Sequence, residues 1–288
     1  MDDSPRAVGY GRTVRGRIGA VARYTALGVA AVLFLLPFYL IVRNGLASEA
    51  DITAPNWTFF PTSLHWSNVT ELFHDPSVPM ARAMGNSAVV SVVQTVGQVA
   101  LSSMAGYGLA RIPFRYANVV FGAIVATLMI PAAVTFVPTF VVVSSLGWVS
   151  TLRGLIIPGL FSGFTAFLFR QYFLSFPKEL EEAARVDGLG HWGAYWRIVV
   201  PNSLGFFAAI GVITFLGAWN AFLWPLVIGQ DESSWTVQVA LSSFLTGQTV
   251  NLHELFVAAA VAILPLLLVF VFLQRYLVQG VAESGIKG

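Results

Sequence analysis

Residues 182–201 read EAARVDGLGHWGAYWRIVVP, a polar and charged stretch within a chain that is otherwise strongly apolar. Six of its positions follow the spacing E-A-A-x₃-G-x₉-I-x-[L/V]-P, and these are Glu182, Ala183, Ala184, Gly188, Ile198 and Pro201. A match at six positions within twenty residues is a specific signal. The sequence on both sides of the stretch has the composition of a membrane protein.

The composition of the whole chain points to a lipid environment. Of its 288 residues, 56% are hydrophobic and 10% are charged, whereas soluble domains carry about 25% charged residues. A soluble fold cannot bury that much apolar surface, so the bilayer is the expected solvent. Cysteine is absent, which excludes a disulfide framework and any thiolate metal site.

Apolar stretches of membrane-spanning length, about 20 residues, recur six times along the chain. They cover residues 24–44, 85–110, 117–143, 151–174, 206–229 and 255–278. We therefore expect an all-α, polytopic membrane protein with six transmembrane helices. Residues 1–23 would form a cytoplasmic segment, and residues 24–288 a single transmembrane domain.

The first apolar stretch admits a second interpretation. Arg12, Arg15 and Arg17 precede it, as basic residues precede the apolar core of a secretory signal. The stretch is longer than such a core, which has roughly 7–15 residues. An uncleaved first span is therefore the better interpretation.

The distribution of basic residues predicts the orientation, because cytoplasmic loops of membrane proteins are enriched in Lys and Arg. With the N-terminus in the cytoplasm, thirteen of the sixteen basic residues lie in cytoplasmic segments or at cytoplasmic span ends. These are Arg6, Arg12, Arg15, Arg17, Arg23, Arg111, Arg115, Arg170, Lys178, Arg185, Arg197, Arg275 and Lys287. Six spans then place both termini in the cytoplasm. The external loops 48–84 and 230–253 are large enough to seat a soluble partner.

The loop at residues 175–203 is expected to form a cytoplasmic helix–turn–helix. Pro177 suits a helix start, and Gly188 suits a helix end because glycine adopts the left-handed conformation at low cost. A second helix is expected from His191 to Val199, ended by Pro201.

This loop has a docking interpretation and a simpler alternative. Ala183 and Ala184 would offer a smooth surface to another protein, and Glu182 would offer a carboxylate acceptor. In the alternative, the loop is an amphipathic surface segment anchored by Trp192 and Trp196. The complete spacing pattern favours docking.

Several segments together resemble the smaller permease subunit of carbohydrate ABC importers of the maltose type. Besides the loop they are Met129-Ile130-Pro131, Pro138, Gly147, Phe176-Pro177-Lys178-Glu179-Leu180, Ala183-Ala184-Arg185-Val186-Asp187-Gly188, Trp219-Asn220, Gln274-Arg275 and Gly285-Ile286-Lys287-Gly288. The chain departs from the pattern at Val200, where leucine is preferred, and at Ala221, where an acidic residue is common.

The resemblance implies a bacterial inner-membrane importer of several subunits. A second permease would complete the translocation pathway, two ATPase subunits would bind ATP and Mg, and an extracytoplasmic solute-binding protein would deliver a sugar. ATPase coupling would fall to Glu182, Ala183, Ala184, Asp187, Gly188, Ile198 and Pro201. The tail at residues 280–288 would also reach the ATPase.

No residue pattern indicates chemistry in this chain itself. A phosphate-binding loop needs G-x-x-x-x-G-K-[ST], and neither of the two lysines, Lys178 and Lys287, follows such glycines. ATP hydrolysis is therefore expected in a separate chain. We expect no catalytic residues, no metal site, no cofactor in this chain and no nucleic-acid binding, because the four histidines lack metal-ligand spacing and no nucleophile–base constellation is present.

Two features are candidates for the substrate pathway. Ser87, Ser91, Gln94, Gln98 and Ser102 fall on one side of the second span. Such a polar stripe either lines a pathway or bonds helices together. Asn220, near Pro225, marks either part of a binding site or a packing kink.

Three rival functions remain. A glycerol phosphodiester or a polyol could replace the sugar as substrate. A proton-coupled secondary transporter or a membrane-embedded enzyme would need acidic or metal-binding groups within the spans. The six predicted spans contain no Asp or Glu, which disfavours both.

Overall fold

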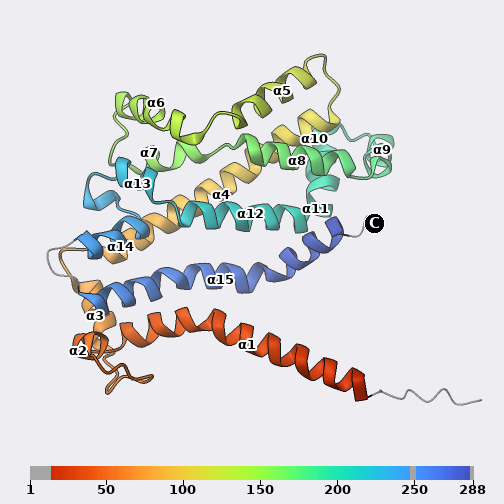
Figure 1. Cartoon of the computed structure of the whole chain (residues 1–288). Coiled ribbons are helices and arrows are strands. Elements are labelled where there is room, and N and C mark those ends of the chain that lie inside the picture. The colour runs from red at the N-terminus through yellow and green to blue at the C-terminus, as the bar shows by residue number, and fades with distance from the viewer. Residues whose placement is uncertain (1–13, 247–250, 286–288) are drawn as a thin grey trace, which may run out of the picture.

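The computed structural model describes residues 14–246 and 251–285, and these residues form helices and turns without a strand. The long helices α1 (Val14–Gly45), α4 (Met80–Arg111), α8 (Gly163–Ser175), α12 (Leu204–Trp219) and α15 (Leu252–Gly285) run beside one another (Figure 1). Helix α4 packs against α8 and α12, α12 against α15, and α15 against α1. The all-α prediction is confirmed.

The short helices gather at the two ends of this bundle (Figure 1). One end holds α2 (Glu49–Thr53), α3 (Ser67–His74), α13 (Leu223–Ile228) and α14 (Val237–Thr246). The opposite end holds α9 (Lys178–Val186), α10 (His191–Ala194) and α11 (Val200–Asn202). The start of α1 and the end of α15 lie at the α9 end, as an even number of crossings requires.

Four helical segments are long and apolar enough to cross a membrane, and two bent helix pairs raise the number to six. The four are Gly19–Gly45, Met80–Arg111, Leu152–Ser175 and Leu252–Gln274. The third of them joins α7 (Leu152–Ile156), the 3₁₀ turn η1 (Ile157–Gly159) and α8. The predicted number of spans is reached only if each bent pair counts as one crossing.

The predicted third span, residues 117–143, is not one continuous helix. It is divided into α5 (Ala117–Leu128) and α6 (Ala132–Ser145), which meet at an angle of 98°. Pro131 is the physical cause, because proline lacks an N–H and disfavours helical geometry at the preceding residue, Ile130. Pro131 adopts extended geometry and caps the start of α6.

The predicted fifth span, residues 206–229, is correct only in its first part. Helix α12 ends at Trp219, and a separate helix, α13, follows three residues later. A continuous helix would drive the ring of Pro225 into the carbonyl of Ala221. Placing Pro225 in the first turn of α13 avoids that clash.

The first span is longer than predicted, and it is exposed. Helix α1 begins at Val14, so residues 14–23 are helical, whereas residues 1–13 of the predicted cytoplasmic segment lie outside the described residues. Its apolar stretch is uncovered by the rest of the chain. Near its end, the buried Arg43 donates hydrogen bonds to Asn44 and Thr58. Arg43 therefore has a structural role on the side where few basic residues were expected.

An aromatic cluster fixes the α9 end of the bundle. Its buried members come from α4, α8, α12 and the segment after α10, and they are Tyr107, Phe169, Phe173, Phe176, Tyr195, Val199 and Ile210. This cluster seats the polar loop on the ends of the long helices.

Candidate coupling site

Helix α9 begins and ends as the sequence predicted. Pro177 caps its start, where a missing N–H is harmless. At its end, Gly188 has φ +83° and donates a backbone hydrogen bond to Arg185, while Leu189 donates one to Ala184. These two bonds form a Schellman motif, which satisfies the last carbonyls of the helix. Gly188 therefore sets the direction in which the chain leaves α9.

The second half of the loop is more irregular than predicted. Helix α10 begins at His191 as expected, but a π-helical turn, η2 (Tyr195–Val199), and α11 carry the helix past Pro201 to Asn202. The prediction that Pro201 ends the helix was therefore wrong. Pro201 sits at the start of α11, where its N–H is not needed. The chain then bends by 79° into α12.

Helix α9 has an outward and an inward face. Glu182, Ala183 and Val186 are exposed, and Val186 is 88% exposed. Because residues three and four apart are neighbours on a helix, these three side chains form one surface. Glu181 and Ala184 are buried on the other side. The expectation that Ala184 is presented to a partner was wrong, and Val186 takes its place on the exposed surface.

The buried carboxylate of Glu181 joins α9 to the end of α4. Its Oε1 lies 3.2 Å from Nε of Arg111, and its Oε2 accepts a hydrogen bond of 3.1 Å from the Tyr107 hydroxyl. Arg111 also donates to the backbone carbonyl of Phe176. Removing one partner of a buried ion pair costs roughly 3–5 kcal/mol, since the other charge is left without a counter-charge. The sequence motif gave no hint of this contact.

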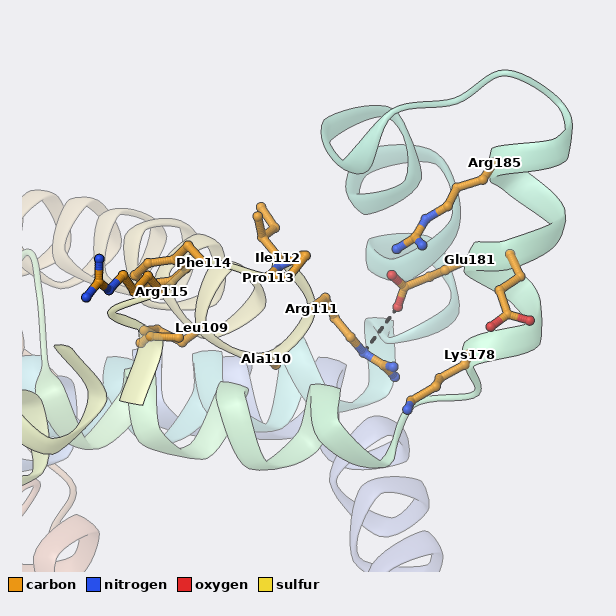
Figure 2. A pocket seen from close by; sticks show the side chains of 12 residues that line it. Leu109, Ala110, Arg111, Ile112, Pro113, Phe114, Arg115, Lys178, Glu181 and Arg185 are labelled. Atoms are coloured by element: carbon orange, nitrogen blue, oxygen red, sulfur yellow. Dashed lines mark ion pairs between the residues drawn. The ribbon is translucent and has the colours of Figure 1, made fainter. Parts of the chain in front are cut away.

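A hollow of about 710 Å³ opens beside this ion pair, between the α4–α5 connection and α9 (Figure 2). Lys178 and Arg185 project from α9 on either side of Glu181, and the Arg111 side chain reaches across from α4. The hollow therefore carries more positive than negative charge near Glu181. Glu182 lines its outer margin.

The remaining predicted loop residues differ in exposure. Asp187 and Pro201 are exposed, whereas Ile198 is half-buried beside the buried Val199. Trp192 and Trp196 stand out from the loop and pack edge to face against each other. The exposed face of α9 and these two rings together form the protruding surface of the loop.

A second hollow, of about 500 Å³, lies among α4, α6, the α7–α8 segment, α12 and α13. Gln94 and Gln98 line it. Both amide nitrogens also bond to the neighbouring helices, that of Gln94 to the Leu155 carbonyl at 2.8 Å and that of Gln98 to Thr165 Oγ1 at 2.8 Å. These two residues thus combine the two roles that the sequence left open.

The rest of the predicted polar stripe packs between helices. Ser87 accepts a hydrogen bond from the Val237 backbone, Ser102 contacts the Ser162 carbonyl at 3.4 Å, and Ser91 is fully buried. Asn220 does not line the hollow. It is exposed at the end of α12, where its side chain bonds to Leu216 and Gln238. Its neighbour Ala221 lines the hollow instead.

Within residues 14–246 and 251–285 no group of three or more His, Cys, Asp or Glu side chains is placed to hold a metal ion. What the described arrangement provides is a protruding loop, a buried ionic connection beneath it and a polar hollow within the bundle.

The comparisons with known proteins identify the family. Residues 98–283 match the family of binding-protein-dependent transport system inner membrane components. The arabinooligosaccharides transport system permease protein AraQ of Bacillus subtilis is 32% identical, with 90% of this chain and 92% of AraQ covered. The sn-glycerol-3-phosphate transport system permease protein UgpE of Yersinia enterocolitica is 31% identical, with 91% and 95% covered. The chain therefore belongs to the binding-protein-dependent transport system inner membrane components.

A solved structure shares the fold. A chain of a bacterial ABC transporter involved in the import of the acidic polysaccharide alginate superposes with a TM-score of 0.80 at 22% sequence identity. The match covers 95% of this chain and 99% of that chain. The predicted permease fold is confirmed.

Proposed function

We propose that this chain is a permease subunit of an ATP-driven sugar importer, and that it is coupled to its ATPase through the outward face of α9. The observation that carries the proposal is the protruding surface of Glu182, Ala183 and Val186 on a helix whose inner face is fixed by a buried ion pair. An exposed apolar side chain beside small and acidic residues suits a protein contact. A rigid helix beneath it suits the transfer of force.

ATP hydrolysis belongs to separate subunits in this proposal. The chain has no phosphate-binding loop, and its two lysines lie outside any such pattern. Two ATPase subunits would bind ATP and Mg and would contact α9 from below. Glu182 would accept hydrogen bonds or face a cation on the ATPase, as Ala183 allows close approach of the two backbones.

The orientation follows from the location of the loop. The α9 end of the bundle lies in the cytoplasm, and both termini lie on that side. A second permease completes the pathway, and the loops around α2, α3 and α14 face the extracytoplasmic binding protein. Helix α1, which is exposed along its apolar stretch, contacts lipid or the second permease.

A neutral, hydroxyl-rich substrate fits the hollow lined by Gln94 and Gln98. None of the described lining residues is charged, and Thr135, Thr139 and Thr214 add hydroxyl groups to the two amides. Hydroxyl and amide groups match the hydrogen-bonding groups of a sugar. A phosphate ester, the substrate type named for UgpE, would lack a cationic partner in this hollow. We therefore favour a sugar over a glycerol phosphate.

The test is purification of the tagged permease in mild detergent, followed by identification of the associated chains. We expect a second permease and an ATPase to co-purify. Uptake by cells that depend on this importer should then be compared for neutral oligosaccharides and glycerol 3-phosphate. Isolation of the permease without an ATPase would refute the proposal. Preferential uptake of glycerol 3-phosphate would refute the assignment of a sugar.

A further inference from the structure

We propose that Arg111, Glu181 and Tyr107 form a polar connection through which movement of the coupling loop reaches α4, with Arg111 and Glu181 as positioning residues. The inference rests on the proposed function, since it concerns how that loop acts on the spans. It assigns a role to Glu181, which precedes the residues of the recognised motif.

The covalent connections of the loop do not include α4. The chain enters α9 from α8 and leaves α11 into α12, whereas α4 is more than sixty residues away in sequence. Any force that reaches α4 must therefore pass through non-covalent contacts. The contacts of Glu181 supply two polar ones, the 3.2 Å approach to Arg111 and the 3.1 Å hydrogen bond from Tyr107.

These contacts are built to stay closed when the loop moves. Glu181 is 3% exposed, and the side chain of Arg111 is 6% exposed, so water cannot easily replace either partner. The second half of the loop is tied to the same helix, because Ser103 and Tyr195 share a hydrogen bond of 2.7 Å. Both halves of the loop are therefore fixed to one stretch of α4.

Helix α4 leads from this connection to the substrate hollow. Arg111 is its last residue, and Gln98 lies thirteen residues earlier, a distance of about 20 Å along the helix axis. Gln94 and Gln98 line the hollow and bond to the α7–α8 segment. A displacement of α9 that carries Arg111 with it thus displaces the polar wall of the hollow.

The experiment measures movement of α4 directly and needs no knowledge of the substrate. Spin labels are placed on a Val96→Cys, Leu268→Cys background, since both side chains are exposed and the native chain has no cysteine. The distance between the labels is measured in the assembled transporter without nucleotide and with ATP and vanadate. Retention of the ATPase and its rate of ATP hydrolysis are recorded on the same samples.

We expect a nucleotide-driven distance change in the parent, and its loss in Arg111→Gln and Glu181→Gln while ATP hydrolysis continues. Tyr107→Phe removes one hydrogen bond without leaving a charge unpaired, so it should reduce the change while the protein stays folded. The exchange Arg111→Glu with Glu181→Arg should restore it. Arg115→Gln is the matched control, because Arg115 lines the same hollow and is exposed, and it should leave the change intact.

An unaltered distance change in both single variants would overturn the inference. So would failure of the exchanged pair to recover, because the charge pairing would then not be the determining feature. Loss of the ATPase from the single variants would also overturn it, since the residues would then serve docking. If no ATPase associates with the parent, the proposed function itself fails, and that outcome is distinct from the others.

Discussion

Gly106 of α4 lies so close to Phe169 of α8 that a Cβ at Gly106 would stand 2.7 Å from the Phe169 Cβ and 2.8 Å from the Arg170 backbone nitrogen. This contact lies between Ser103 and Tyr107, the residues that hold the two halves of the loop. Only glycine allows the two backbones to approach this closely. The packing of α4 on α8 therefore determines where the loop connection sits.

Gly106→Ala should destabilise the permease, because the added methyl group meets backbone and Cβ atoms that cannot move aside. Overpacking of this kind costs about 1–3 kcal/mol. Thermal unfolding of the detergent-purified protein measures the effect. Gly108→Ala is the control, since no atom lies within 4 Å of the position that its methyl group would take, and it should be neutral or slightly stabilising. Equal stability of the two variants would contradict the packing argument.

Gly188→Ala should weaken coupling without blocking membrane insertion. At φ +83° a side chain is strained, at a cost of roughly 1–2 kcal/mol, and relief of that strain would redirect the chain after α9. We expect reduced uptake and reduced retention of the ATPase at unchanged permease levels. Gly190→Ala, at a residue with φ −74° and open space around it, should behave as the parent does. Identical uptake by both variants would show that the turn has no role.

Gln94→Leu and Gln98→Leu should separate helix bonding from substrate contact. Each change removes one interhelical hydrogen bond, and such bonds are worth about 0.6 kcal/mol on average in membranes. Assembly should therefore be only slightly weakened. Because both residues also line the hollow, the sugar concentration for half-maximal transport should rise. Asn220→Leu should leave it unchanged, since Asn220 lies outside the hollow. A strong assembly defect with unaltered concentration dependence would leave these residues a packing role alone.

Single cysteines in this cysteine-free chain test the orientation. Trp66→Cys and Glu232→Cys should react with an impermeant thiol reagent added to spheroplasts, because both residues are exposed at the end opposite α9. Val186→Cys and Trp192→Cys, which are exposed on the loop, should react only after the membrane is opened. Asn68 is unsuitable for labelling because it is buried and bonded to the Gly45 and Ala47 carbonyls. Labelling of position 186 in intact spheroplasts would invert the proposed topology.

The sequence predicted what depends on local chemistry. The Gly188 turn, the Pro177 start of α9 and the start of α10 at His191 follow from backbone preferences and are confirmed. The break at Pro131 was also readable from local rules, but the apolar composition of residues 117–143 masked it. A window average responds to hydrophobicity and ignores backbone geometry.

What the sequence could not supply was long-range pairing. Nothing in the spacing of Glu181 and Arg111 distinguishes a buried ion pair from two solvated charges, because the contact depends on how α4 and α9 pack. For the same reason the motif alone could not tell the buried Ala184 from the exposed Ala183. The amphipathic pattern of α9, with Glu181 between more exposed neighbours, was the one usable signal.

The most direct test of the coupling role of α9 is the amount of ATPase that stays on the purified permease after Glu182→Lys. Glu182 is exposed on the outward face of α9, so the change should leave the fold intact while it reverses a charge at the proposed contact. Glu232→Lys, an exposed acid at the other end of the bundle, controls for the charge change itself. We predict that Glu182→Lys loses the ATPase whereas Glu232→Lys retains it. Full retention of the ATPase by Glu182→Lys would contradict the account.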